Sequence, residues 1–98
     1  MNDLMTLFRV AEIDPSVPAL DVHGMRLEEA KHEIDFFLDR VMRSGVRIGK
    51  IIHGKGEEIL SRQLPDFLRK LPIIENIHIP GGTYETGAVI YVSLKVYE

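Results

Sequence analysis

The chain runs twice from an apolar stretch into a His-Gly turn: at Leu20-Asp21-Val22-His23-Gly24 and, with its histidine 30 residues later, at Ile52-His53-Gly54-Lys55-Gly56. Each apolar stretch has the composition of a short β-strand, and each turn is followed by an amphipathic helical pattern. Strand-to-helix turns of α/β proteins are where ligands and catalytic groups collect. Two such turns, each with a histidine, therefore indicate one composite site that handles an anion.

The composition limits the class of protein. The 98 residues suffice for one domain, and 45% hydrophobic with 28% charged residues is typical of a globular protein. Cysteine is absent, which excludes disulfides, thiol nucleophiles and cysteine-ligated zinc. No apolar run approaches the ~18–20 residues of a membrane-spanning helix, and no signal peptide is visible. We therefore expect a cytoplasmic protein without a membrane partner.

Charge is distributed unevenly along the chain. The formal net charge is −3, but residues 40–70 carry eight basic side chains against three acidic ones. A local positive potential, rather than the net charge, steers a polyanion toward a protein. The segment is compatible with nucleic-acid binding, although an ordinary solvated surface explains these charges equally well.

Hydrophobic periodicity predicts a strand, helix, strand, helix, strand, strand order, over residues 19–22, 27–44, 46–52, 57–71, 74–79 and 88–97. The first helix lacks an N-cap side chain, because Met25 and Arg26 stand there, and Gly45 is expected to end it. Proline is tolerated in the first turn of a helix or at a kink. Because of Pro65, the second regular helix is expected to begin near Ser61, with that residue as its N-cap.

Residues 1–18 fit no clean period, so they are expected to form a lead-in, either a short turn or an extended arm, ahead of a domain at 19–98. The element order of that domain predicts an α/β (α+β) two-layer sandwich: a four-stranded mixed sheet with two helices on one face. Right-handed crossovers make the first, second and third strands parallel. The turns at Gly24 and Gly54 and the loop at Gly81 and Gly82 would then meet at one edge of the sheet.

The last strand alternates between an apolar and a more polar side, which predicts that one face of the sheet is uncovered. That face would carry His78, Tyr91, Lys95 and Tyr97. It is either a stacking surface for single-stranded nucleic acid or, more simply, a half-exposed sheet or dimer contact. His32 falls on the polar side of its helix and is expected to be an ordinary surface residue.

Taken in order and at this spacing, four motifs carry a family resemblance: Leu-Asp-Val-His-Gly at 20–24, Glu-Glu-Ala at 28–30, Ile-His-Gly-Lys-Gly at 52–56, and the glycine-rich loop before the last strand. Together they resemble the Smr (small MutS-related) domain family over residues 19–96. The resemblance implies a fold similar to the C-terminal domain of translation initiation factor 3. It also implies nucleic-acid binding and, in several members, nicking or endonuclease activity on DNA or RNA.

The sequence departs from the family pattern in three places. Glu58 stands where the family has a third glycine, and Ser61 stands where it has an arginine or lysine. Arg62 follows one residue later, which places it about 100° round a helix. The late glycine-rich pattern is stretched over 81–88, and Val89 replaces its threonine. We expect these changes to affect phosphate binding and substrate preference more than the fold.

Phosphodiester cleavage needs a base for the nucleophile, stabilisation of charge on the phosphate, and protonation of the leaving oxygen. In the resemblance, His23 is the candidate base, Asp21 orients it or holds a divalent ion such as Mg²⁺ or Mn²⁺, and His53 is the partner acid or a phosphate ligand. The candidate nucleic-acid-binding residues are Gly24, Gly54, Lys55, Gly56, Arg62, Gly81, Gly82 and Tyr84.

Each of these residues alone also has an ordinary explanation. Asp21 could cap its turn, and the rings of His23 and His53 could bind loop backbone. As an ordered set at one edge they favour function. A metal site is less favoured, because no third strong ligand stands at a recognisable spacing. The main alternative is a non-catalytic module of a larger repair or rescue protein that binds nucleic acid or the ribosome. We expect a monomer or weak dimer.

Overall fold

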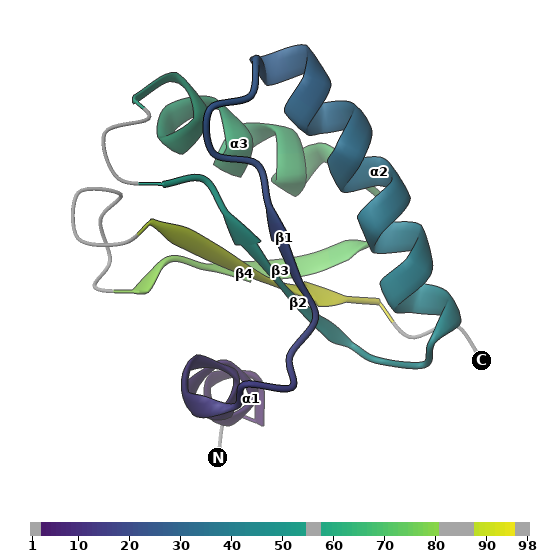
Figure 1. Cartoon of the computed structure of the whole chain (residues 1–98). Helices are drawn as coiled ribbons and strands as arrows, with labels where there is room; N and C mark the ends of the chain where they lie inside the picture. The colour runs from purple at the N-terminus through teal and green to yellow at the C-terminus, as the bar shows by residue number, and fades with distance from the viewer. Residues whose placement is uncertain (1–2, 55–57, 81–87, 96–98) are drawn as a thin grey trace.

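The computed structural model describes residues 3–54, 58–80 and 88–95. In this part of the chain the elements follow the order given in Figure 1: α1 (Asp3–Ile13), β1 (Ala19–Asp21), α2 (Leu27–Arg43), β2 (Ile48–Ile52), α3 (Glu58–Lys70), β3 (Ile74–His78) and β4 (Val89–Leu94). The predicted order from residue 19 onward is confirmed. Several elements are shorter than predicted, and none of the helices described is long and apolar enough to cross a membrane.

The four strands form one mixed sheet in the order β1-β2-β4-β3. β1 pairs parallel with β2, and β4 pairs antiparallel with both β2 and β3. β1, β2 and β3 therefore point the same way, as the crossover rule predicts. Because Asp21 pairs with Ile52, the two His-Gly turns begin at the same end of the sheet.

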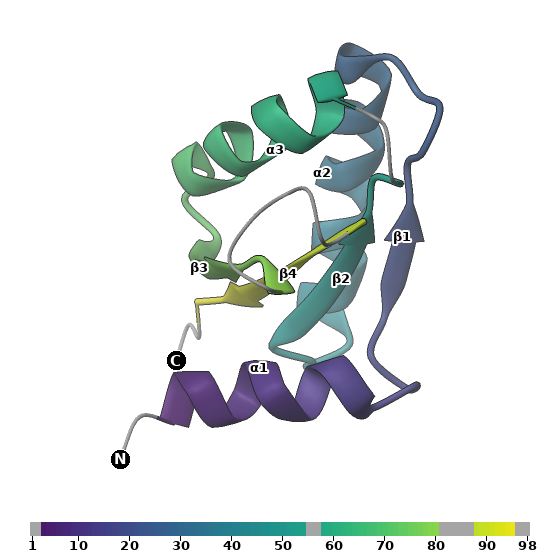
Figure 2. The same ribbon diagram turned by 90° about the vertical axis from the view of Figure 1, so that its left-hand side faces the viewer.

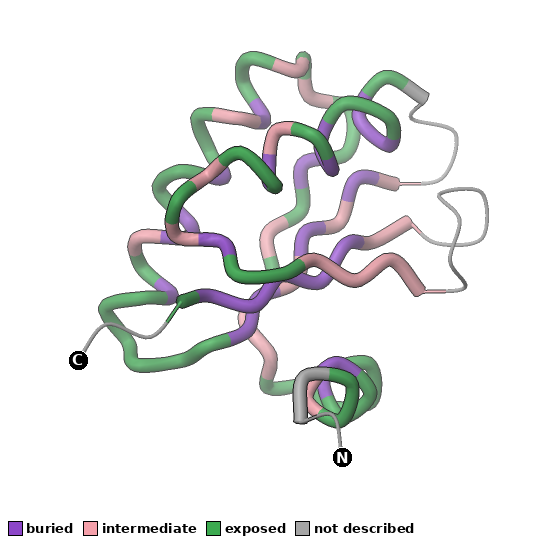
Figure 3. Tube along the Cα trace, turned by 180° about the vertical axis from the view of Figure 1, so that it is seen from behind, coloured by how far each residue is buried: buried purple, intermediate pink, exposed green. Residues whose placement is uncertain are grey.

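The helices α2 and α3 cover one face of the sheet, as predicted (Figure 2). The buried side of α2 consists of Ala30, Ile34, Phe37, Leu38 and Val41. This side packs on alternate residues of the strands, and the buried residues in Figure 3 lie mainly along the strands and the inner sides of these helices. Gly49 permits the close fit, because a Cβ there would lie 3.1 Å from the Phe37 ring.

The prediction that regular helix begins near Ser61 is wrong. α3 begins at Glu58, Ser61 is buried inside it, and Pro65 stands in its interior. A proline removes one backbone hydrogen bond from a helix. Tertiary burial outweighs that loss here, because Leu60, Leu64 and Leu68 are almost wholly buried against the sheet.

The expectation of a turn or extended arm before residue 19 is also wrong, because Asp3–Ile13 forms the helix α1. α1 lies on the face of the sheet opposite α2 and α3 (Figure 2), where Phe8 and Ala11 are buried. The helical period of residues 3–13 is hard to see in the sequence because apolar side chains also stand on the outer side of this helix. These are Met5, Val10 and Ile13, the last of them 82% exposed.

The predicted uncovered face is therefore largely covered, and α1 adds a layer to the two-layer arrangement. Tyr91 is buried in a cluster with Phe8. The rings of His78 and Phe8 stack with centroids 5.1 Å apart, and His78 Nε2 lies 3.3 Å from Glu12 Oε1. The sheet face cannot serve as an open stacking surface while α1 is docked. Tyr97 lies outside the described residues.

Replacing Phe8 with alanine tests the packing of α1. We expect Phe8→Ala to lower the free energy of unfolding by about 3 kcal/mol, because it removes a buried ring and leaves a cavity between helix and sheet. Urea denaturation followed by far-UV circular dichroism measures the change. Val10→Ala on the exposed side of the same helix is the control, with an expected change within about 0.5 kcal/mol. Equal, small effects of both substitutions would show that α1 does not pack on the sheet.

Candidate functional site

The first His-Gly turn closes directly after β1. The Val22 N–H donates to the Ile52 carbonyl at 2.8 Å, and the Met25 N–H donates back to the Val22 carbonyl at 3.1 Å. His23 and Gly24 are the middle residues of this turn, and Gly24 has a φ of +77°. A positive φ at this position is the requirement of a type II turn, which glycine meets without steric cost. The backbone therefore explains the glycine, and the turn presents His23 to solvent.

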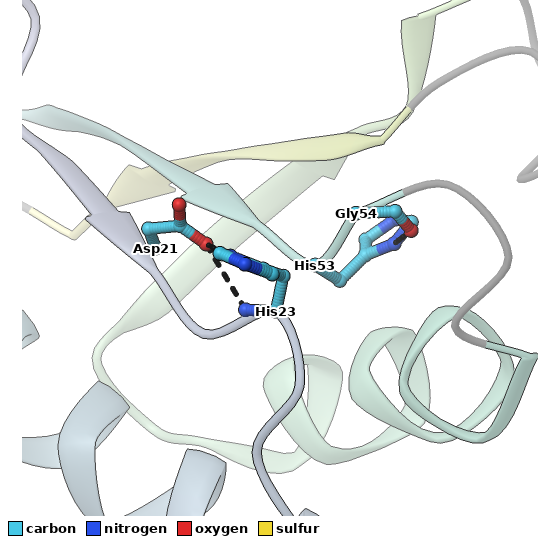
Figure 4. A network of polar contacts seen from close by, with 4 residues as sticks. All are labelled: Asp21, His23, His53 and Gly54. Carbon is cyan, nitrogen blue, oxygen red and sulfur yellow. Dashed lines mark hydrogen bonds and ion pairs between the residues drawn. The ribbon is translucent and has the colours of Figure 1, made fainter.

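Asp21 and His23 form a directly bonded pair (Figure 4). Asp21 Oδ1 accepts hydrogen bonds from the His23 backbone N–H at 3.0 Å and from the ring nitrogen Nδ1 at 2.6 Å. The side chains are 49% and 67% exposed, respectively, so the pair is open to a ligand. The first of these bonds, and then the second, hold the pKa of the Asp21 carboxyl below its ordinary value.

The pair fixes the tautomer of the His23 ring. An ionised carboxylate only accepts hydrogen bonds, so Nδ1 carries the proton that is shared with Asp21. In the neutral ring Nε2 is then the nitrogen with a lone pair. A carboxylate that holds one ring nitrogen while the other faces the reaction is the arrangement that orients histidine bases in hydrolytic sites.

The second His-Gly turn has a different environment. The N–H groups of His53 and Gly54 both donate to the Ala88 carbonyl, at 2.8 Å and 3.1 Å, and Gly54 has a φ of +87°. His53 is only 1% exposed, and its Nδ1 lies 3.0 Å from the Gly54 carbonyl oxygen. Since that oxygen accepts, Nδ1 carries the proton. Nε2 is buried and has no hydrogen-bond partner in the part of the chain that the structure describes.

The structure brings the two histidines to neighbouring strand ends without joining them. Figure 4 shows the Asp21–His23 pair on one strand end and the His53 ring on the next, turned toward Gly54. The predicted site therefore divides into an exposed acid–histidine pair and a buried histidine. The burial of His53 had a signal in the sequence, because Gly49, Ile51 and His53 are spaced by two and face the helices α2 and α3.

The N-terminus of α2 adjoins the first turn. Arg26 is its N-cap residue and makes no side-chain cap hydrogen bond, as predicted. The first turn of α2 carries Glu28 and Glu29, which favour the helix N-terminus electrostatically and place negative charge near Asp21.

The remaining candidates are only partly placed. Arg62 is exposed on α3, while its neighbour Ser61, at the position where the family has a basic residue, is buried. The others fall outside the described residues: Lys55, Gly56, Gly81, Gly82 and Tyr84.

The described residues do not fit a resident metal ion. No group of three or more His, Cys, Asp or Glu side chains comes together within residues 3–54, 58–80 and 88–95. Asp21 and His23 bind each other through Oδ1 and Nδ1, so these two atoms are already engaged and few ligand atoms remain at the pair for a cation.

Comparison with known proteins identifies the family. The sequence model of the Smr domain matches residues 20–95. Endonuclease MutS2 of Thermomicrobium roseum is 34% identical over 80 residues, which are 81% of this chain and 10% of that protein. Ribosome rescue factor SmrB of Aeromonas hydrophila is 28% identical over 79 residues, which are 81% of this chain and 45% of that protein.

The fold agrees with a solved structure as well. The crystal structure of the Smr domain of Thermus thermophilus MutS2 superposes with a TM-score of 0.72 at 28% identity, over 82% of this chain and 100% of that one. The chain thus spans about a tenth of the MutS2 relative and under half of SmrB. The motif set, the fold and the match over residues 20–95 together show that this chain belongs to the Smr domain family.

Proposed function

We propose that this domain binds nucleic acid and nicks phosphodiester bonds of DNA or RNA. The observation that carries the proposal is the exposed Asp21–His23 pair, with 2.6 Å between Oδ1 and Nδ1. The matching relatives named as endonucleases support the reaction class. The proposed reaction is hydrolysis, in which water attacks phosphorus and the bond to one sugar oxygen breaks.

In this mechanism His23 is the base. Asp21 stays ionised and holds the proton of Nδ1, so Nε2 of the neutral ring takes a proton from the attacking water as its oxygen bonds to phosphorus. The Asp21 charge then stabilises the imidazolium that forms. The leaving sugar oxygen accepts a proton from a partner acid or from solvent, and the scissile phosphate loses one ester bond.

His53 is proposed as the partner acid or a phosphate ligand. Its ring is buried with a proton on Nδ1, so either role requires Nε2 to carry a second proton and to become accessible to the substrate. Lys55, with the amides of Gly54 and Gly56, is proposed to bind the phosphate, together with Gly24, Arg62, Gly81, Gly82 and Tyr84.

A non-catalytic module is the second candidate. The similarity to ribosome rescue factor SmrB favours it, as does the small share of the longer relatives that this chain spans. Such a module would bind nucleic acid or the ribosome and leave cleavage to another part of a larger protein. A cytoplasmic location and a monomeric or weakly dimeric state stay predictions in either case.

Removing either member of the pair tests the nicking activity. We expect Asp21→Asn and His23→Ala each to slow nicking by roughly 10²–10⁴-fold, the usual contribution of a positioned base. Asp21→Asn keeps an oxygen that accepts the His23 N–H but removes the charge. The assay follows supercoiled plasmid and structured RNA, with Mg²⁺, with Mn²⁺ and with a chelator.

His32→Ala is the matched control, because this exposed histidine packs edge-on against Phe36, on α2 rather than at the turn. It should nick like the unmodified protein. Equal nicking by all four proteins would remove the pair from the mechanism. Salt-sensitive binding without nicking under any metal condition would favour the non-catalytic module.

The ionisation of Asp21 gives a separate prediction. Its carboxyl should titrate below the ordinary value of about 3.9 in carbon-13 NMR, because hydrogen bonds from His23 favour the charged form. The stabilisation is complete above the ordinary pKa and is lost as pH falls through the lowered one. In His23→Ala the midpoint should rise only part of the way, since the backbone N–H bond is the larger cause. A midpoint at or above the ordinary value would contradict the pair.

A further inference from the structure

Six exposed basic side chains gather at the edge of the sheet away from the catalytic pair. α2 and α3 run antiparallel to β1, β2 and β3, so the C-terminal ends of these helices lie where β2 and β3 start and β4 ends (Figure 1). We call this the basic edge; its residues are Arg40, Arg43, Arg47, Arg69, Lys70 and Lys95.

Backbone hydrogen bonds join the chain segments that carry Arg47 and Lys95 of the basic edge. The Leu94 N–H donates to the Arg47 carbonyl at 2.7 Å, and the Lys95 N–H donates to the Ile73 carbonyl at 2.9 Å. Arg47, just before β2, and Lys95, just after β4, therefore lie on neighbouring segments beside the start of β3. Neighbouring strands are about 5 Å apart. Such a row suits a polyanionic chain better than a single small anion.

Three of the six cations are balanced and three are not. Asp39, Glu75 and Asp66 pair with Arg43, Arg47 and Arg69 at 2.9, 3.5 and 3.7 Å. Among the described residues no carboxylate pairs with the other three cations: Arg40, Lys70 and Lys95. The basic edge therefore keeps an excess of positive charge.

Helix stabilisation explains only part of this row. Cations in the last turn of a helix are favoured by its dipole, which accounts for the basic residues at the ends of α2 and α3. Arg47 and Lys95 lie outside both helices, so the dipole does not account for them.

The edge with the catalytic pair lacks such an excess. Asp21, Glu28 and Glu29 are exposed there, and the described residues set Arg26, Arg62 and Lys31 against them, with Lys31 3.3 Å from Glu28. A nucleic acid that meets Asp21 and His23 must be held against this negative charge. Much of the electrostatic attraction that the described residues offer lies at the other edge.

A groove lies beside the start of β1 and adjoins the basic edge. Its volume is about 310 Å³, and it is lined by Pro18, Ala19, Phe37, Arg40, Val41 and Ser44. β1 is an edge strand, and the Pro18 carbonyl and Val22 N–H bind β2. Backbone groups alternate in direction along a strand, so the N–H groups of Ala19 and Asp21 point outward. The outer side of β1 thus offers donors from the groove to the catalytic aspartate.

We propose that the basic edge binds a single strand of nucleic acid and that this strand passes from the groove along the outer side of β1 to Asp21 and His23. The inference rests on the proposed function. Strands of five or six residues at about 3.3 Å each separate the edges by roughly 20 Å. At about 3.4 Å per nucleotide, a strand needs roughly six nucleotides to reach both edges.

Oligonucleotides of two lengths test the proposal. Binding is measured by fluorescence anisotropy with single-stranded DNA and RNA of about 4 and about 12 nucleotides, in an Asp21→Asn background that prevents cutting. The edge variant combines Arg40→Gln, Lys70→Gln and Lys95→Gln. The matched control removes the same charge from positions away from the basic edge, through Arg9→Gln, Lys31→Gln and Lys50→Gln.

We expect the edge variant to bind the long strand about 10-fold more weakly, with a salt slope smaller by about 2, and to lose less affinity for the short strand, which contacts fewer of the cations. The control variant should stay within about 2-fold for both lengths. Equal losses in both variants, or a loss that does not depend on length, would overturn the inference. The DNA and RNA arms identify which strand supplies the phosphates.

The nicking assay separates this inference from the proposed function. If the protein nicks through Asp21 but the edge variant binds the long strand normally, the basic edge is refuted and the nicking activity stands. If long-strand binding depends on the basic edge but no nicking occurs, the basic edge stands and the nicking activity fails.

Discussion

The parallel pairing of β1 with β2 is the constraint on which the site depends. It sets Leu20 opposite Ile51 and Asp21 opposite Ile52, and it continues into the bond from the Val22 N–H to the Ile52 carbonyl. Each strand feeds a turn and then a helix, so this pairing places both turns at one end of the sheet. A slip of one residue would turn Asp21 from the outer side to the core and separate it from solvent.

The helix α1 covers the face of the sheet opposite α2 and α3. With α2 and α3 on one face and α1 on the other, the sheet retains polar exposure at its two ends and at the outer side of β1. The ends differ in charge because each helix begins near the site and ends away from it. The helix dipole favours acidic residues in the first turn of α2 and basic residues in its last turn. The same helix therefore adds negative charge at the end with the site and positive charge at the basic edge.

Patterns that act over a few residues were readable from the sequence. The inner stripe of α2, the alternation in β4 and the turn glycine Gly24 each follow from local periodicity or backbone geometry, and the crossover rule supplied the parallel strands. Interactions between distant elements were not readable. Pro65 is tolerated only because α3 packs on the sheet, and α1 was hidden by apolar side chains on both of its sides. The sequence predicted that Asp21 could orient His23. The 2.6 Å contact itself depends on the turn at His23 and Gly24, whose geometry the sequence did not specify.

The two similar His-Gly strings differ because of a single-residue offset. His23 stands three residues after Leu20, while His53 stands two after Ile51, the partner of Leu20 in the register. Continuing that register by one residue aligns Val22 with His53, and both are buried. His23 falls one position later and turns outward to meet Asp21. The one-residue offset therefore places one histidine in the exposed turn and the other at a buried position, and the exposed histidine is the one that pairs with a carboxylate.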